Sequence, residues 1–366
     1  MKRKKHLISL LALCLSLLCT LPLISCGSAA VLTFEKYSYN VHYYTYWLSR
    51  FKASFLYSYT DVKDSDEYFD SVISSDGRTA DQIMTEMSDE VVSRYLVSEY
   101  YFDQYGLTLS DSKLEEIDRQ LESVVTELAD GSKTAFNKIA AEYGINYRML
   151  REIYIIEAKN ELFQSYYKEN YLMPALTDET RRAYCLENYA KTEVLFIGTE
   201  YKRNLDADGN PIYDENGSSS VPLSDAEKAE KDAIVASLEE TLTAENYMDL
   251  RKQYNDDPAA ETYTNGYYFS LNMDYDQGVL TAARLMKPGE VRRVDTSYGV
   301  YFLLRLETEA DAYSEEVNAD FFDGFDDSIV SEQLDKLYEK ETANVVFHDE
   351  AREGISVKTV RPCYYF

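Results

Sequence analysis

The sequence predicts an α+β protein with a helical part and a smaller part built around a sheet. Amphipathic helical patterns follow one another from about residue 39 to residue 189. A strand pattern at 191–198 and a hairpin-like pattern at 287–306 then interrupt this helical order. With 366 residues, the chain is long enough for about two domains, each with its own core.

Residues 1–25 have the pattern of a secretory signal peptide. Basic residues at 2–5 precede an apolar run that extends to about Leu21 and is too short for a stable membrane span. The run ends in Leu-Ile-Ser-Cys at 23–26, which resembles a bacterial lipobox. We therefore expect cleavage before Cys26 and lipidation of its thiol, because two or more acyl chains anchor a protein stably. The alternative is an ordinary signal peptide with an incidental cysteine.

The composition excludes several classes of function. The chain has 37 basic and 65 acidic residues, a net charge of −28, which argues against nucleic acid as a partner and against direct adsorption to an anionic membrane. After Cys26 only Cys185 and Cys363 remain, and the three histidines are scattered. We therefore expect no disulfide framework and no metal site, and the pattern disfavours a Ser-His-Asp or Cys-His hydrolase.

The first helical pattern, which begins near Tyr39, is rich in aromatic residues. Tyr43, Trp47 and Phe51 recur at four-residue steps, as they would on one face of a helix. One interpretation is that these rings pack in the core. The other is that they line a groove for extended apolar peptides.

Further helices are predicted by their start and stop signals. A helix at 80–105 ends at Gly106. Ser110 or Ser112 begins the next helix, and Ser112 with Glu115 fits a capping box. A shorter helix ends at Gly144. The remaining two are expected at about 146–171, capped by Asn146, and from Thr177 to Tyr189.

The smaller part begins with the strand at 191–198 and a polar insert at 199–223. The insert contains Asp206, Asp208 and Asn210, but its glycines do not fit a calcium-binding loop, so we expect an exposed hairpin or loop.

Ser224 and Glu227 form another capping box, which predicts a helix to about Leu242. A short helix at 244–254 follows, and a last helix is predicted at about 316–340. A short tail with strand character at Val345–Phe347 comes after it.

Three stretches of the helical part carry a family resemblance. They read YYFDQYGLTLSDSKLEEI at 100–117, FNKIAAEYGINYRMLREIYIIEAKNELF at 136–163 and LTDETRRAYCLENY at 176–189. In this order they resemble the helical chaperone domain of extracytoplasmic parvulin-type foldases, the SurA and PrsA type.

The later part carries a second resemblance. Gly266, Tyr268 and Met273 precede Lys-Pro-Gly-Glu at 287–290 and Thr-Ser-Tyr-Gly at 296–299, which is similar to a parvulin-type peptidyl-prolyl isomerase domain. The resemblance implies that this domain is inserted into the helical one. The expected division is a parvulin-like domain at 191–309, a helical domain at 26–190 completed by 311–345, and a C-terminal helix and tail at 310–366.

The resemblance also implies a site. The catalytic positions correspond to Glu193, Asp257, Thr296 and Tyr301, and the proline pocket to Tyr268, Met273 and Val279. Tyr301 stands where the family usually carries its second histidine, and Glu193 is the best match to the first. No histidine occurs between residues 43 and 347, so both are absent. The chemistry implied by the family needs no cofactor.

Three functions remain as alternatives. The first is a lipid-anchored extracytoplasmic foldase of a bacterial cell membrane, which binds unfolded or nascent secreted polypeptides and catalyses prolyl isomerisation. The second is a holdase of the same architecture without catalysis, because both histidines are absent. The third is a surface lipoprotein that binds a small ligand through some of its 34 tyrosines.

Overall fold

The computed structural model describes residues 29–206, 210–215 and 217–366, so the predicted signal peptide and Cys26 lie outside the described residues. The chain divides into two compact units. The helical unit comprises the described residues up to Leu172 together with Gln333–Phe366, and the sheet unit comprises Met173–Glu332. The predicted α+β class, with a sheet-containing unit inserted into a helical one, is confirmed.

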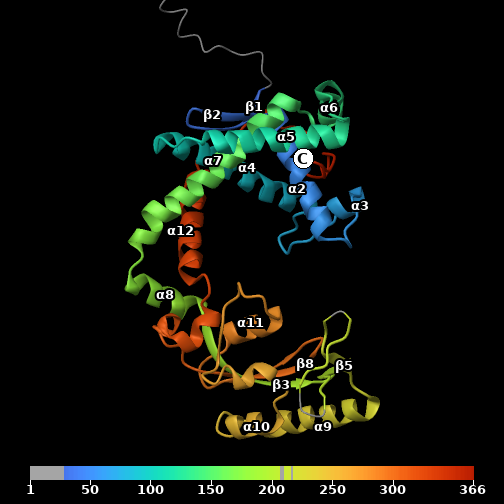
Figure 1. The fold of residues 1–366 in the computed structure, drawn as a ribbon, viewed down its shortest axis with the longest axis vertical. Coiled ribbons are helices and arrows are strands. Elements are labelled where there is room, and N and C mark those ends of the chain that lie inside the picture. The colour runs from blue at the N-terminus through green and yellow to red at the C-terminus, as the bar shows by residue number, and fades with distance from the viewer. Residues whose placement is uncertain (1–28, 207–209, 216) are drawn as a thin grey trace, which may run out of the picture. The chain divides into compact units, whose positions relative to one another are not determined.

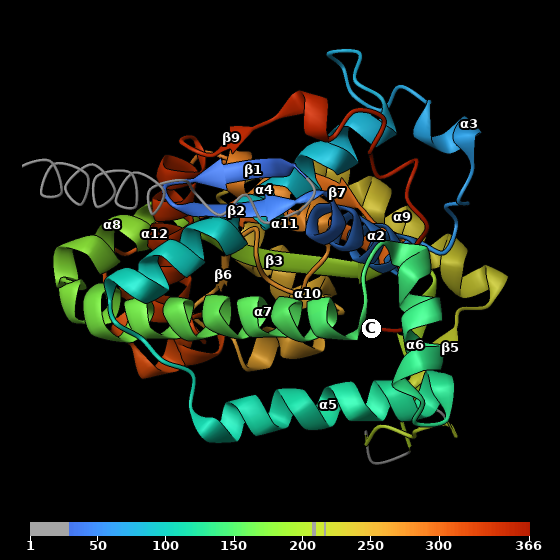
Figure 2. The same cartoon turned by 90° about the horizontal axis from the view of Figure 1, so that it is seen from above.

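The helical unit contains seven labelled α-helices and a small sheet among its described residues (Figure 1). The helices are α2 (Val41–Ser58), α3 (Asp66–Phe69), α4 (Ala80–Gln104), α5 (Asp111–Ala129), α6 (Lys133–Ala140), α7 (Tyr147–Tyr167) and the later part of α12 (Phe325–Thr342). Helices α5 and α7 lie side by side (Figure 2), and a π-helical turn at Lys168–Leu172 extends α7. Short 3-10 helices occur at Ala141–Tyr143 and Asp349–Ala351.

The three-stranded sheet of the helical unit was only partly predicted. Strands β1 (Ala30–Phe34), β2 (Tyr37–Asn40) and β9 (Val346–Phe347) pair antiparallel in the order β2-β1-β9. The sequence suggested strand character only near residue 346. The hairpin was missed because four- and five-residue strands carry little periodic signal before the helix that Asn40 caps.

The aromatic residues of α2 mainly build the core of the helical unit. Tyr44, Tyr46 and Trp47 are buried. The hydroxyl of Tyr44 donates to Asp89 at 2.7 Å, and the indole nitrogen of Trp47 donates to Glu157 at 3.2 Å. The burial of Tyr44 and Trp47 is therefore compatible with their polar groups because each has a carboxylate partner, whereas the buried hydroxyl of Tyr46 has no hydrogen-bond partner among the described residues.

The sheet unit is a four-stranded antiparallel sheet with the order β6-β3-β8-β7. Helix α11 covers one face, and α9 and α10 cover the other (Figure 1). The strands are β3 (Ala190–Gly198), β6 (Tyr267–Phe269), β7 (Val291–Asp295) and β8 (Gly299–Arg305), with a separate hairpin of β4 (Tyr201–Arg203) and β5 (Ser220–Pro222). The helices are α8 (Asp178–Asn188), α9 (Asp225–Thr241), α10 (Tyr247–Tyr254) and α11 (Gln277–Leu285), with 3-10 turns at Met173–Ala175, Pro258–Glu261, Ala312–Ser314 and Glu316–Phe321.

Side-chain caps begin several helices where the sequence predicted them. Asn146 accepts from the Met149 amide at the start of α7. Ser224 and Glu227 form a complete capping box at α9. At α5 the cap is Ser110, the first of the two predicted positions.

The division between the units lies earlier than the sequence suggested, at Met173 and not at residue 191. Helix α8 therefore belongs to the sheet unit. Its Cys185 is fully buried in that unit's core, and Arg181 forms a bidentate ion pair with Asp326 at 2.8 Å for both bonds. No helix in the described part of the chain is both long and apolar enough to cross a membrane.

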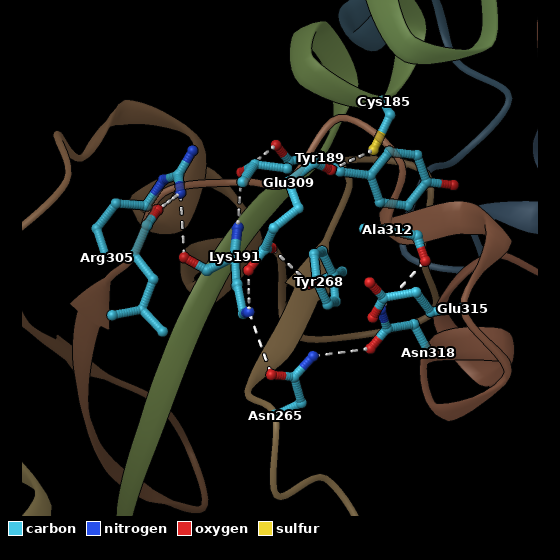
Figure 3. Close-up of polar contacts among 12 residues, drawn as sticks. Cys185, Tyr189, Lys191, Asn265, Tyr268, Arg305, Glu309, Ala312, Glu315 and Asn318 are labelled. Atoms are coloured by element: carbon cyan, nitrogen blue, oxygen red, sulfur yellow. Dashed lines mark hydrogen bonds and ion pairs between the residues drawn. The ribbon is translucent and has the colours of Figure 1, made fainter. Parts of the chain in front are cut away.

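A buried lysine, Lys191, connects the segment by which the chain enters the sheet to the segment by which it leaves (Figure 3). The ammonium of Lys191 is 2.6 Å from a Glu309 oxygen and 3.4 Å from Asn265, and it lies over the ring of Tyr268. The Tyr268 hydroxyl donates to the second Glu309 oxygen at 2.7 Å. Asn318 accepts from Asn265 at 3.4 Å and so extends the network. We call these five residues the lysine clamp.

The clamp depends on the charge of Glu309. Partial burial alone would raise the pKa of this carboxyl, but hydrogen bonds from Lys191 and Tyr268 lower it on balance. Because the pKa of Glu309 is lowered in the folded state, its charge stabilises the fold fully at pH values above the ordinary glutamate pKa. That contribution is lost as the pH falls through the folded pKa.

We expect Glu309→Gln to reduce the stability of the sheet unit at pH 7 by about 1 kcal/mol, because half of the carboxylate is exposed and the pair is partly screened. Hydrogen exchange of amides in β3 and β6 would measure this difference. The difference should be complete above the ordinary glutamate pKa and should decrease as the pH falls through the lowered pKa of Glu309. Glu307→Gln, an exposed neighbour, is the control; a Glu309→Gln difference that does not decrease on acidification would contradict the clamp.

Candidate functional site

The register between β3 and β8 brings two aromatic rings together on the face of the sheet that α11 covers. Phe196 lies directly opposite Tyr301, with their ring centroids 4.5 Å apart. Tyr275, in the loop before α11, lies 6.2 Å from the Tyr301 ring and 5.0 Å from Phe269. Tyr267 adjoins Phe269 at 5.7 Å. We call these five residues the aromatic cluster.

The hydroxyls of Tyr275 and Tyr301 interact by a side-chain hydrogen bond. Burial raises the pKa of Tyr275, and the neighbouring phenol of Tyr301 raises it further. Burial also raises the pKa of Tyr301, and this effect outweighs the hydrogen bond with Tyr275, which lowers it. Both phenols are therefore protonated at neutral pH and can act as hydrogen-bond donors.

Asp257 lies beside the cluster but its carboxylate already has partners. One oxygen accepts from the Ala259 amide at 2.9 Å and caps the 3-10 turn that begins at Pro258. The other accepts from the hydroxyl of Tyr267. The predicted catalytic carboxylate thus has a structural role in this arrangement.

Thr296 likewise closes the turn between β7 and β8. Its hydroxyl donates to the Gly299 carbonyl at 2.9 Å and accepts from the amides of Tyr298 and Gly299, each at 3.3 Å. A Cβ on Gly299 would lie 2.2 Å from the Ile197 carbonyl oxygen, so only glycine fits this close approach.

Glu193 lies away from the aromatic cluster. It is an odd number of residues from Phe196, so its side chain emerges from the opposite face of β3. There its carboxylate is 3.4 Å from the guanidinium of Arg251 on α10. Burial raises the pKa of Glu193, although Arg251 and Lys191 lower it. The structure does not bring this carboxylate to Tyr301.

The three predicted pocket residues occupy different environments. Tyr268 points into the lysine clamp, on the face of β6 opposite to its neighbour Tyr267. Val279 is fully buried in α11, where it packs in the core. Met273 is half-buried and packs against the same core, and its sulfur accepts from the Ser270 amide at 3.3 Å.

Sequence reasoning missed Phe196, Tyr267 and Tyr275. The alternation of side chains along a strand is the signal that could have found the first two, once the register of β3 against β6 and β8 was known. Tyr275 lies in a loop, where no such periodicity exists.

A cavity of about 680 Å³ adjoins the aromatic cluster within the sheet unit. Phe196, Pro258 and Tyr298 line it on one side, and the β4–β5 hairpin contributes Tyr201 and Leu205 on the other. Its basic side chains are Lys202, Arg203 and Lys231. Described residues of the insert, at 201–205 and 218–220, therefore contribute to the lining of this cavity, and the volume lies in the range of ligand-binding pockets.

Neither the cluster nor the cavity has the chemistry of a metal centre. Among the described residues, no group of histidine, cysteine, aspartate or glutamate side chains is arranged to hold a metal ion. The aromatic cluster offers neutral phenols and apolar surfaces, and the cavity adds the charged side chains of Lys202, Arg203, Lys231 and Asp256.

No family model and no curated protein matches the chain. Comparison with solved structures did find similar chains. PrsA from Bacillus subtilis is 22% identical, with 74% of this chain and 93% of that chain covered and a TM-score of 0.21. Foldase protein PrsA from Streptococcus pneumoniae is 14% identical, with 76% and 95% covered and a TM-score of 0.26. Peptidylprolyl isomerase (PrsA) from Bacillus cereus is 15% identical, with 75% and 90% covered and a TM-score of 0.23.

These structural neighbours are PrsA proteins. At these TM-scores the likeness carries no argument about chemistry. The function proposed below therefore rests on the geometry of the cluster and the cavity.

We expect Thr296→Ala to destabilise the sheet unit by about 1 kcal/mol, because it removes the hydroxyl that closes the β7–β8 turn. Thr296→Ser keeps the hydroxyl and should retain most of the stability. Urea denaturation followed through hydrogen exchange in β7 and β8 would measure both variants. Equal stability of Thr296→Ala and wild type would show that the turn does not need this hydroxyl.

Proposed function

We propose that this protein is a lipid-anchored extracytoplasmic foldase that binds unfolded secreted polypeptides and accelerates prolyl isomerisation. The observation that carries the proposal is the cavity of about 680 Å³ lined by Phe196, Tyr201 and Tyr298, because the Phe196 ring also contacts the ring of Tyr301, at a centroid distance of 4.5 Å. Apolar segments and proline rings are exposed in unfolded chains, and aromatic walls can bind both.

Prolyl isomerisation makes modest chemical demands. No bond between heavy atoms is broken, and the barrier of about 18–20 kcal/mol comes from loss of amide resonance as the peptide bond twists. A site needs an apolar surface that excludes water and a donor that favours the twisted amide over the planar one. The neutral hydroxyl of Tyr301, held among Phe196 and Tyr275, has these properties.

A holdase without catalysis is the second candidate function. It is favoured by the hydrogen bonds within the fold that already involve Asp257 and Thr296, and by the absence of histidine from residues 43 to 347. Both candidates require binding of unfolded chains, so they differ only in the rate of proline isomerisation.

We expect the wild-type protein to accelerate cis-to-trans conversion of a proline-containing peptide, and Tyr301→Phe to lower kcat/KM about tenfold, the effect of one lost hydrogen bond of about 1.4 kcal/mol. The rate should be independent of pH from about 6 to 9, because the raised pKa of Tyr301 keeps the donor protonated throughout this range. Protease-free isomerisation kinetics by NMR exchange would measure both quantities.

Tyr254→Phe is the matched control, since this half-buried tyrosine packs on the opposite face of the sheet. Suppression of the aggregation of an unfolded client is measured in parallel. If the wild-type protein suppresses aggregation but does not accelerate isomerisation, the holdase is the function that remains. If it does neither, the proposal is overturned.

The membrane anchor is part of the proposal and rests on the sequence alone. We expect Cys26→Ala to abolish incorporation of labelled palmitate and to release the protein from the membrane fraction, because the acylated thiol is lost. Cys19→Ala should leave both unchanged, since Cys19 lacks a small preceding residue. If the Cys26→Ala variant incorporates no palmitate but stays in the membrane fraction, anchoring at Cys26 is refuted.

A further inference from the structure

The cavity of the sheet unit is lined by more positive than negative charge, although the chain as a whole is strongly acidic. Its described lining contains three basic side chains, Lys202, Arg203 and Lys231, and one acidic side chain, Asp256. The net charge of the whole chain is −28. Because exposed charges more than about 8 Å apart are largely screened at physiological ionic strength, a bound ligand responds mainly to these local charges.

Two of the three basic side chains already have a carboxylate partner. The ammonium of Lys231 lies 2.8 and 2.6 Å from the two oxygens of Asp256. The ammonium of Lys202 pairs with Glu227 on α9. Arg203 forms no ion pair with a carboxylate in the part of the chain that the structure describes. Its guanidinium is therefore the uncompensated charge of the described lining.

The pairing of β4 with β5 determines which side chains face the cavity together. Arg203 lies directly opposite Ser220, and opposite residues of an antiparallel pair point to the same face. Tyr201 lies two residues before Arg203 on the same strand and shares this face. All three residues line the cavity, so one face of the hairpin presents a guanidinium, a hydroxyl and an aromatic ring to it.

This combination of groups fits a carboxylate next to an apolar ring. A guanidinium offers paired N–H donors that match the two oxygens of a carboxylate, and the hydroxyl of Ser220 adds a further donor. The other side of the cavity carries Phe196, Pro258 and Tyr298, against which a proline ring can pack. A peptide with an acidic residue beside a proline satisfies both sides of the cavity.

We propose that this cavity selects proline-containing segments in which aspartate or glutamate precedes the proline, and that Arg203 determines this specificity. The inference rests on the proposed function, since it names the class of client segment that the same site binds. Arg203 and Ser220 belong to the insert at 199–223, whereas Tyr301 belongs to β8 of the four-stranded sheet. Specificity and catalysis therefore depend on different elements and can be changed separately.

The test measures how tightly the full-length protein binds three fluorescein-labelled peptides that differ only in the residue before a single proline. This residue is glutamate, glutamine or lysine. We expect the glutamate peptide to bind with a Kd about fivefold lower than the glutamine peptide, the effect of one partly exposed ion pair, and the lysine peptide to bind most weakly. The difference between glutamate and glutamine should decrease as the salt concentration is raised, because salt screens the pair.

Three variants identify the residue responsible. Arg203→Gln should remove the difference between the glutamate and glutamine peptides and leave the Kd of the glutamine peptide unchanged. Arg203→Glu should reverse the order, so that the lysine peptide binds more tightly than the glutamate peptide. Lys287→Gln removes an exposed cation of the same unit that does not line the cavity, and this matched control should keep the wild-type preference. Because Arg203 is also exposed, all variants should keep the wild-type melting curve.

The outcomes separate this inference from the proposed function. Equal binding of the three peptides by the wild type, or a glutamate preference that persists in Arg203→Gln, overturns the inference. Loss of the preference in Lys287→Gln also overturns it, because net charge would then be responsible. If the wild type accelerates isomerisation or suppresses aggregation without any glutamate preference, only the inference fails. If the preference depends on Arg203 but isomerisation is not accelerated, the inference stands and the catalytic part of the proposed function fails.

Discussion

Hydrogen bonds from tyrosine hydroxyls to carboxylates recur in both units and hold their cores together. The chain has 65 acidic and 37 basic residues, so many carboxylates lack a cation with which to pair. Phenols add donors to carboxylates that already pair with a lysine: Tyr39 donates to Glu99 at 2.9 Å, which also pairs with Lys159, and Tyr268 donates to Glu309, which also pairs with Lys191. A neutral donor satisfies a further lone pair of such a carboxylate without the cost of burying another charge. In both units, the tyrosine hydroxyls therefore contribute to the polar networks around the cores.

Within the sheet unit, the register of β3 against β8 decides which of these groups meet. Side chains alternate along a strand, so a slip of one residue would exchange the faces. In the observed register Phe196 faces Tyr301, and Glu193 faces Arg251 on the other side. The lysine clamp fixes the start of β3 next to the segment that follows β8, so the clamp and the register support the same arrangement.

The order of the elements could be predicted from the sequence because it depends on local signals. Asn146 and Ser224 cap helices as expected, and the Pro-Gly and Tyr-Gly turns flank β7. The side-chain environment of the site could not be predicted, because it depends on non-local pairing. Thr296 and Asp257 were expected near reacting atoms, yet their polar atoms are used by the turn and the 3-10 cap beside them. Local hydrogen bonds of such residues compete with any role that position alone suggests.

The cavity of the sheet unit differs from the cores in how its tyrosines are used. The core residue Tyr44 is buried, and its hydroxyl donates to the carboxylate of Asp89. Tyr201 and Tyr298 line the cavity and are 51% and 61% exposed, so their rings are not part of a core. An acidic surface keeps such a protein soluble while it presents aromatic groups. Exposure of rings at a cavity, and not the number of tyrosines, is thus the feature on which the proposed binding of unfolded chains rests.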